Sequence, residues 1–283
     1  AVLAVHGRGD VAARAATDAL AGGDAAGSLA LSQQAANLMD ARAFISVVLG
    51  TQVRALAALG RAEEAQKVVA QYAPSLAPDQ KARLDQAVAW AWVKAGDVAK
   101  ARALLADAAS QMGETSGWLA LYDGDLKSAR AKLKATSSAT PELLTALALL
   151  ERSKADSNVL AGKAFLDLAR GDTIAAASEF ERAAQTLPDA APLVLAVAAR
   201  LYGNRHDAVR SVALWKTVVE KHPDAPEAPE GDLEWGRAMR RQKNAPVAIE
   251  RLEHLILTYP QSALVPQARR ELELVRATIP ATP

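Results

Sequence analysis

The sequence predicts an all-α protein, and three observations carry that prediction. Alanine is the commonest residue, whereas aromatic residues make up only 4% of the chain and β-branched residues are sparse, a composition that favours helices over strands. Short breaks centred on glycine recur between the alanine-rich stretches. After each break, a small and a large apolar residue recur four positions apart, which places both on one helix face. We therefore expect a series of amphipathic helices separated by turns.

Length and composition indicate a folded chain with a sizeable core. The 283 residues suffice for two ordinary domains or one elongated repeat array, and 51% of them are hydrophobic. The 33 Lys and Arg residues nearly cancel the 32 Asp and Glu residues, so nucleic acid is not the expected partner. No apolar run reaches the length of a membrane span. The chain begins at Ala1 rather than Met, so we expect it to be processed or to be a piece of a longer protein.

Seven breaks mark the predicted helix pairs. A glycine at a break can end one helix in the left-handed conformation, and an Asp or Asn after it can cap the amides of the next helix. Each break should therefore join the two helices of a hairpin. The breaks are Gly22-Gly23-Asp24, Leu59-Gly60-Arg61, Ala95-Gly96-Asp97, Asp123-Gly124-Asp125, Arg170-Gly171-Asp172, Asn204 to Asp207, and Lys243-Asn244.

The spacing of the breaks indicates a repeat. Gly23, Gly60 and Gly96 lie 37 and 36 residues apart. Three successive later units also end alike, with Pro188, Pro223 or Pro260 eight residues after the large apolar position, where proline ends a helix. The small and large residues of each unit are Ala65 and Val69, Ala101 and Leu105, Ala129 and Leu133, Ala176 and Phe180, Ser211 and Trp215, and Ala248 and Leu252.

This pattern resembles the tetratricopeptide repeat (TPR) family, whose units are helical hairpins of about 34 residues. The resemblance covers residues 41–260 well and the first 40 residues poorly. It implies a right-handed, TPR-like solenoid of about seven helical-hairpin repeats with a C-terminal capping helix, stacked so that a concave groove remains. The family's characteristic positions are matched by Leu160, Ala164, Gly171, Ala176, Phe180, Ala183 and Pro188 in one unit, by Leu195, Ala199, Tyr202, Trp215 and Pro223 in the next, and by Gly236, Ala248, Leu252 and Pro260 in the last.

The repeats and their irregularities suggest four segments. Residues 1–40 form a divergent N-terminal hairpin and residues 41–137 form regular repeats. Residues 138–222 form further repeats with an extra helix near 141–154, because Thr140-Pro141-Glu142 has the chemistry of a helix start. Residues 223–283 form the final repeat and the capping helix. Three prolines in His222 to Gly231 make that stretch the expected bend between stacked units.

The resemblance also implies which residues face the groove, since in this family one position of each first helix lines it. Trp90 and Trp92 test the matching, because residues two apart on a helix point about 200° apart; Trp92 takes the core position and Trp90 the groove. The groove should accept apolar side chains of a bound segment and pair its backbone or acidic groups with arginines. The expected groove residues are Arg54, Trp90, Trp118, Phe165, Arg200, Arg237, Arg240 and Arg241. The alternative is that Trp118 and Phe165 pack between units and that the arginines are solvated.

Nothing in the sequence indicates catalysis, so we expect no enzyme, no cofactor and no metal. The four histidines are scattered, without a pair at the spacing of helical metal ligands, and the chain contains no cysteine. Asp123-Gly124-Asp125 coincides with a repeat turn, which favours helix capping over a calcium loop. Aromatic and arginine side chains in one groove could also stack nucleic-acid bases, but the balanced charge argues against that.

The last unit resembles a narrower group. Leu255 to Ser262 ends in Tyr-Pro-Gln-Ser and is followed by Val265-Pro266-Gln267-Ala268, which looks like repeats of bacterial envelope proteins, including the Tol-Pal-associated coordinator and lipoproteins of outer-membrane assembly. Pro266 should open a helix at a position that needs no amide donor. The resemblance implies a periplasmic or cell-envelope location, with the cytoplasm as the alternative.

These observations lead to one expected function and two alternatives. We expect a non-catalytic adaptor that binds a protein or peptide segment in its groove, within a bacterial cell-envelope complex. One alternative is a structural subunit held in a large assembly through its convex face and ends. The other is the docking arm of a longer multidomain enzyme or regulator.

Overall fold

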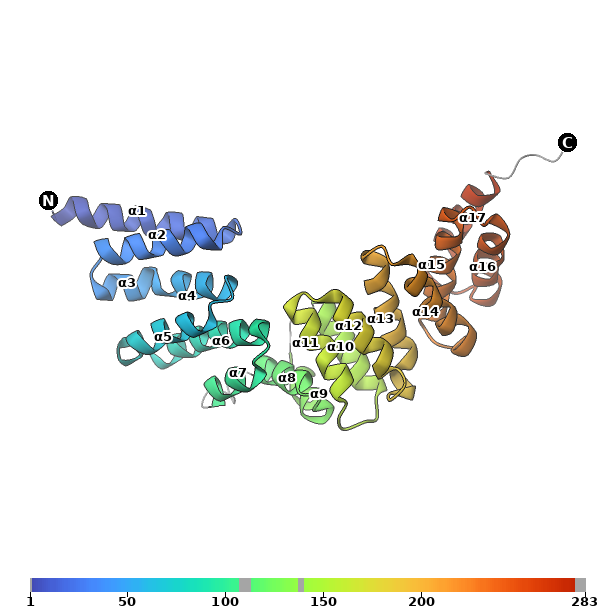
Figure 1. The fold of residues 1–283 in the computed structure, drawn as a ribbon, viewed down its shortest axis with the longest axis horizontal. Coiled ribbons are helices and arrows are strands. Elements are labelled where there is room, and N and C mark those ends of the chain that lie inside the picture. Colours follow the sequence, from blue (N-terminus) through green and yellow to red (C-terminus); the bar gives the residue numbers. More distant parts are fainter. Residues whose placement is uncertain (1, 107–112, 137–139, 278–283) are drawn as a thin grey trace. The chain divides into compact units, whose positions relative to one another are not determined.

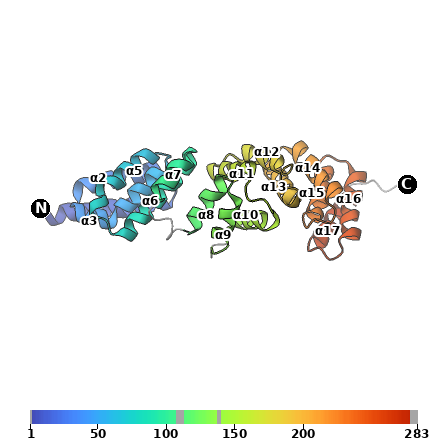
Figure 2. The same ribbon diagram turned by 90° about the horizontal axis from the view of Figure 1, so that it is seen from below.

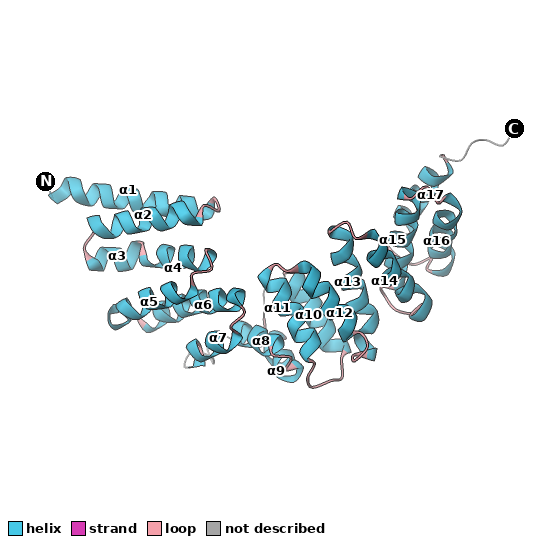
Figure 3. Cartoon of the chain, viewed as in Figure 1, coloured by secondary structure: helices cyan, strands magenta, loops and turns pink. Residues whose placement is uncertain are grey.

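The computed structural model describes residues 2–106, 113–136 and 140–277. These residues form seventeen α-helices and no strand, apart from one isolated bridge between Asp125 and Ser157 (Figure 3). The prediction of an all-α protein is confirmed. The chain divides into two compact units, residues 1–119 and 120–283, and each is described by itself. The four predicted segments stay a prediction.

In the first unit, helices that follow one another along the chain pack in antiparallel pairs. α1 packs on α2, α4 on α5 and α6 on α7, and α4 also contacts α2 and α6. α3 is a short helix directly before α4. The helices are α1 (Val2–Ala21), α2 (Ala25–Leu38), α3 (Ala41–Val47), α4 (Leu49–Ala58), α5 (Ala62–Tyr72), α6 (Pro78–Ala95) and α7 (Val98–Leu104), and α8 (Gly113–Tyr122) crosses the boundary between the units.

In the second unit, every helix from α11 to α17 packs against the next one in the chain (Figure 1). α12 and α14 lie along one side of this unit, whereas α10 and α17 lie toward the other (Figure 2). The helices are α9 (Leu126–Leu133), α10 (Pro141–Arg152), α11 (Val159–Arg170), α12 (Thr173–Ala183), α13 (Ala191–Asn204), α14 (Ala208–Lys221), α15 (Ala228–Arg241), α16 (Ala245–Thr258) and α17 (Val265–Arg276).

The seven predicted breaks share one backbone geometry. At each break one residue has a positive φ, and its N–H bonds the carbonyl three residues back. The next N–H bonds the carbonyl five residues back at 2.9–3.0 Å, which completes the hydrogen-bond pair that ends a helix at a left-handed residue. The positive-φ residues are Gly23, Gly60, Gly96, Gly124, Gly171, His206 and Lys243. Each break therefore reverses the chain by the same local mechanism.

Six of these turns also cap the following helix. The Asp or Asn after the left-handed residue accepts a hydrogen bond from the backbone N–H three residues on, as predicted. The exception is Arg61, which has no such acceptor and instead pairs with Glu64 through two 2.6 Å hydrogen bonds. The capping residues are Asp24, Asp97, Asp125, Asp172, Asp207 and Asn244.

The small and large residues that follow six of the seven turns are part of the core. All twelve are buried, and Trp215 and Phe180 are among the largest fully buried side chains. A small residue at the first position lets a neighbouring helix approach closely. Two glycines of α15 extend the same principle, because a Cβ at Gly231 would lie 2.8 Å from Val219 Cγ2 and one at Gly236 would lie 2.9 Å from Leu252 Cγ. α15 is therefore wedged between α14 and α16.

Four predicted helix starts and ends are confirmed, and the end predicted at Pro188 is wrong. Thr140 accepts the N–H of Leu143 at the start of α10, the extra helix, and Pro266 lies in the first turn of α17. Pro223 and Pro260 follow the ends of α14 and α16. α12 already ends before Pro188, which opens a 3-10 turn instead. The Ser- and Thr-rich stretch 134–140 also predicts a loop, which lies partly outside the described residues.

Among the described residues no single helix is long and apolar enough to cross a membrane. α3 and α4 reach the length and apolar character of a membrane span only when they are taken together, and their axes are bent by 56° at Val48.

A glycine contact joins α11 to the turn between α8 and α9. A Cβ at Gly162 would lie 2.6 Å from both the Gly124 nitrogen and the Leu121 carbonyl oxygen. Asn158 donates its N–H to the Gly124 carbonyl at 2.8 Å, so the segment before α11 is bonded to the same turn. The start of α11 thus lies on backbone, with no room for a side chain at position 162.

We predict that Gly162→Ala destabilises the protein, although alanine is the better helix former. The added methyl group must displace backbone, which costs about 1–3 kcal/mol. Gly7→Ala is the matched control in α1, where nothing lies within 4 Å of the added atom, and there the free energy of unfolding should rise by about 0.5–1 kcal/mol. Denaturant unfolding measures whether the free energy of unfolding falls in Gly162→Ala and rises in Gly7→Ala. A Gly162→Ala variant more stable than the parent would contradict the close contact.

Asp125→Ala should destabilise the protein in a pH-dependent way. The side-chain and backbone hydrogen bonds of Ser128 hold the pKa of Asp125 below its ordinary value. The cap therefore contributes its stability above the pKa of the unfolded chain and loses it as the pH falls through the lower folded pKa.

We expect a loss of about 1 kcal/mol at pH 7 that is smaller at roughly pH 3, which lies below the ordinary pKa of an Asp side chain. Asp18→Ala, on the exposed side of α1, should change stability by less than about 0.5 kcal/mol. Thermal unfolding at both pH values checks this, and an equal loss at both would be inconsistent with a charged cap.

Candidate binding cleft

A cleft of about 680 Å³ in the second unit lies where α13, α14 and α15 meet. We call it the α13–α15 cleft. Its polar lining includes two arginines that the sequence places in the groove, Arg200 and Arg241, together with two glutamates. The side chains that bear on its chemistry are Arg200, His206, Trp215, Glu230, Glu234 and Arg241.

Arg200 spans the cleft and is already paired. Its Nε and Nη2 donate to the two carboxylate oxygens of Glu230 on α15 at 2.7 and 2.8 Å, a bidentate pair. The hydrogen bond to Glu230 raises the pKa of Arg200, and the guanidinium lies 5.9 Å from the ring centroid of the buried Trp215. Arg200 thus ties α13 to α15, and an acidic ligand would have to displace Glu230 to bind it.

One face of α15 forms the opposite wall. Glu230, Glu234, Ala238 and Arg241 all line the cleft, and their spacing of four, four and three residues places them on one helix face. Glu234 accepts a 2.7 Å hydrogen bond from Arg237 Nη1, so its charge is compensated too. Arg241 at the end of this face is the exposed member.

Arg237 and Arg240 face away from the cleft, toward α17. Their Nε atoms donate to the two oxygens of Glu271 at 3.0 and 2.9 Å, and Arg237 Nη2 reaches Gln267 at 3.2 Å. Burial by itself would lower the pKa of Arg237, but hydrogen bonds to Glu234 and Glu271 outweigh it and raise that pKa. Both arginines hold the last helix in place.

Arg241 differs from the other three predicted arginines in this unit. Its side chain makes no hydrogen bond or ion pair with any residue of the described part of the chain, and it lines the cleft. Arg241 can therefore bind an acidic group of a ligand without breaking an ion pair within the chain.

The two turns beside the cleft depart from the glycine rule. His206 and Lys243 have φ values of 63° and 60°, where the other five turns have glycine. A non-glycine residue in this conformation costs roughly 1–2 kcal/mol. Both side chains are exposed, and His206 lines the cleft.

The predicted residues of the first unit do not share one site within it. Arg54 is exposed and lines a separate hollow of about 460 Å³ between α3, α4 and α6, which also contains Arg83. Trp90 on α6 is half-buried, whereas Trp92 is buried and donates to Gln66 at 2.9 Å. The predicted division between Trp92 in the core and Trp90 outside it agrees with this burial.

Two aromatic residues expected in the groove lie in the interior instead. Trp118 is 8% exposed, and Phe165 is 2% exposed with its ring edge-on to Phe180 at a centroid distance of 5.1 Å. Phe165 points toward α12, the second helix of its own hairpin, because burying a large ring there fills the space between the two helices. Neither ring offers a surface to a ligand in this structure, which corrects the expected apolar lining.

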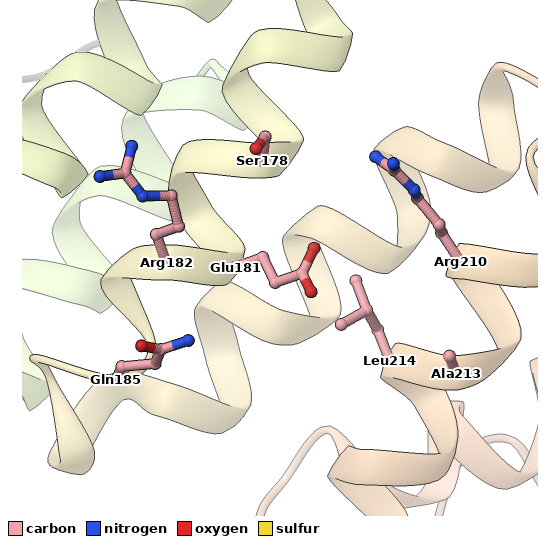
Figure 4. Close-up of a pocket in the computed structure, with 7 residues that line it drawn as sticks. All are labelled: Ser178, Glu181, Arg182, Gln185, Arg210, Ala213 and Leu214. Carbon is pink, nitrogen blue, oxygen red and sulfur yellow. The ribbon is translucent and has the colours of Figure 1, made fainter.

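A second hollow, of about 360 Å³, lies between α12 and α14 (Figure 4). The Glu181 carboxylate and the Leu214 side chain face each other across it, whereas Arg182 points away (Figure 4). Arg182 is bonded to Glu179 at 2.8 Å. This hollow has about half the volume of the cleft and is lined by both acidic and basic side chains, so it makes a weaker candidate than the cleft.

A buried charge cluster lies beside the cleft without opening into it. Asp232 is fully buried, and His254 Nδ1 lies 2.6 Å from its Oδ2, with Arg251 at 3.7 Å from its Oδ1. Burial raises the pKa of Asp232, and the hydrogen bond to His254 partly offsets that rise. Tyr259 stacks edge-on against His254 and donates to the Pro223 carbonyl at 2.8 Å. The cluster ties α15, α16 and the loop before α15 together.

The sequence reasoning missed the acidic half of the cleft. Glu230 lies at the end of the proline-rich stretch from His222 to Gly231, where the bend stays a prediction, and α14 and α15 pack on each other on either side of this stretch. The spacing of Glu230, Glu234 and Arg241 on one helix face was the available signal. Among the described residues, no group of three or more His, Asp or Glu side chains could hold a metal ion.

No family model matches this chain, and no curated protein matches it either.

Glu271→Gln should loosen α17. The carboxylate, 14% exposed, serves both Arg237 and Arg240, and losing a charged acceptor of this kind costs about 1–3 kcal/mol. Glu273→Gln on the exposed side of the same helix is the control and should leave the free energy of unfolding nearly unchanged. Urea unfolding compares them, and equal stability of the two variants would remove the ion-pair bridge from the account.

Proposed function

We propose that the chain is a non-catalytic, TPR-like adaptor that binds a segment of another protein. The observation that carries the proposal is the sevenfold recurrence of one turn geometry between consecutive helices. Hairpins of this kind cannot bury their apolar faces alone, so they stack on their neighbours and leave an inner surface for binding.

The finer architecture belongs to this proposal. It comprises a right-handed solenoid of about seven repeats with α17 as the capping helix. The buried small and large residues after each turn support it, as does the unbroken packing order from α11 to α17. Arg276 also bonds Glu253 at 2.7 Å, which ties α17 to α16 at the end of the array.

The proposed location is the bacterial cell envelope, on the strength of the Tyr259-Pro260-Gln261-Ser262 and Pro266 pattern. In the structure these residues serve helix ends: Tyr259 caps α16, Ser262 Oγ accepts the N–H of Leu264, and Pro266 opens α17. Cell fractionation of the native organism tests this part, and recovery of the chain only from the cytoplasm would contradict it.

Site-specific photo-crosslinking tests the adaptor proposal against a structural subunit held through its outer side. A photoreactive amino acid is placed at Arg241 in the cleft or at Glu181 in the α12–α14 hollow, and each variant is expressed in the native cells. An adaptor should crosslink a partner from position 241 and not from 181. Crosslinks from 181 alone would favour the structural subunit.

A further inference from the structure

We propose that the α13–α15 cleft binds an acidic peptide segment, with a carboxylate of that segment on Arg241. This inference rests on the proposed adaptor function and names the partner's chemistry. The starting observation is a cleft of about 680 Å³ that carries an arginine with no partner in the described part of the chain.

The charge of the cleft selects an acidic partner. Glu230 is neutralised by the bidentate pair with Arg200, and Glu234 is neutralised by Arg237. The positive charge of Arg241 is not compensated by either of these pairs. A carboxylate that binds a guanidinium can form two parallel hydrogen bonds, which makes it a strong ligand for this side chain.

The neighbouring turns add an independent observation. The left-handed position holds glycine in five turns, but it holds His206 and Lys243 in the two turns that flank the cleft. Glycine would fit those positions with less strain, so their side chains are retained at a cost in stability. Both side chains are exposed; His206 lines the cleft, and Lys243 follows the cleft residue Arg241 by two positions.

A peptide suits the cleft better than a nucleic acid. Trp215 is buried, 2% exposed, so the cleft offers no aromatic face on which a base could stack. A phosphate backbone has no hydrogen-bond donor for the carboxylate oxygens of Glu230 and Glu234 on the α15 wall, whereas a peptide can place a single carboxylate on Arg241 and leave neutral residues beside it. The backbone amides of such a segment can also donate hydrogen bonds to these glutamates.

Fluorescence anisotropy with the full chain tests the inference. The probes are a labelled dodecapeptide of repeated Glu-Leu-Ser, the same peptide with Gln in place of Glu, and single-stranded oligothymidylate. We expect the Glu peptide to bind at least about tenfold more tightly than the Gln peptide at low salt, and the difference to shrink as salt screens the charges.

Three variants locate the effect. Arg241→Gln should remove most of the preference for the Glu peptide, whereas Arg269→Gln, at an exposed position of α17 outside the cleft, should change binding by less than about twofold. The double variant His206→Gly with Lys243→Gly should weaken binding of the Glu peptide and yet raise the melting temperature, because glycine relieves both left-handed residues.

The outcomes separate this inference from the proposed function. If peptides bind without distinguishing Glu from Gln, or if Arg241→Gln keeps the preference, the acidic site is wrong while the adaptor function stands. Tighter binding of oligothymidylate than of the Glu peptide would also overturn the inference. If neither peptide binds and position 241 captures no partner in cells, both proposals fall.

Discussion

The left-handed turn that reverses the chain between consecutive helices is the constraint on which the rest of the structure depends. Its backbone hydrogen bonds fix where one helix ends, and in six turns the following Asp or Asn fixes where the next begins. The small residue four positions into the second helix then faces the first, so the two can approach closely. The third helix closes the apolar face that the pair leaves open, as α6 does for α4 and α5. Without the reversal, the buried residues after each turn would have no partners.

The same packing order governs the charges. Arginines and glutamates that lie on alternate helices of the second unit pair with one another, as Arg200 on α13 does with Glu230 on α15 and Arg240 on α15 with Glu271 on α17. These pairs bridge helices about thirty residues apart, so they reinforce the contacts between hairpins rather than within them. They also use up most of the charge that could attract a partner. Arg241, at the end of α15, differs from Arg200, Arg237 and Arg240 because it has no acidic partner in the described part of the chain. The binding proposal therefore rests on Arg241 and its cleft rather than on all four arginines.

The sequence predicted what is decided locally. Turn positions, helix caps, and the small and large core residues follow from the chemistry of neighbouring residues, and Gly124-Asp125 or Ala176 and Phe180 could be assigned without any tertiary information. The rotation of each helix about its axis is decided by helices further along the chain. Phe165 was therefore expected in a groove and lies against Phe180, and Arg237 was expected to face a ligand and binds Glu271, thirty-four residues away. The contact of Gly162 with the turn at Gly124 could not be predicted from the sequence either, because it joins two different hairpins.

Residue-resolved amide hydrogen exchange on the intact chain tests the central claim most directly. The seven backbone N–H groups that bond the carbonyl five residues back belong to Asp24, Arg61, Asp97, Asp125, Asp172, Asp207 and Asn244. The account predicts that all seven exchange slowly, comparably with helix-interior amides of the same hairpins, because each is held in a formed turn. Exchange at the rate of an unstructured amide in several of them would contradict the claim that one recurring turn builds this protein.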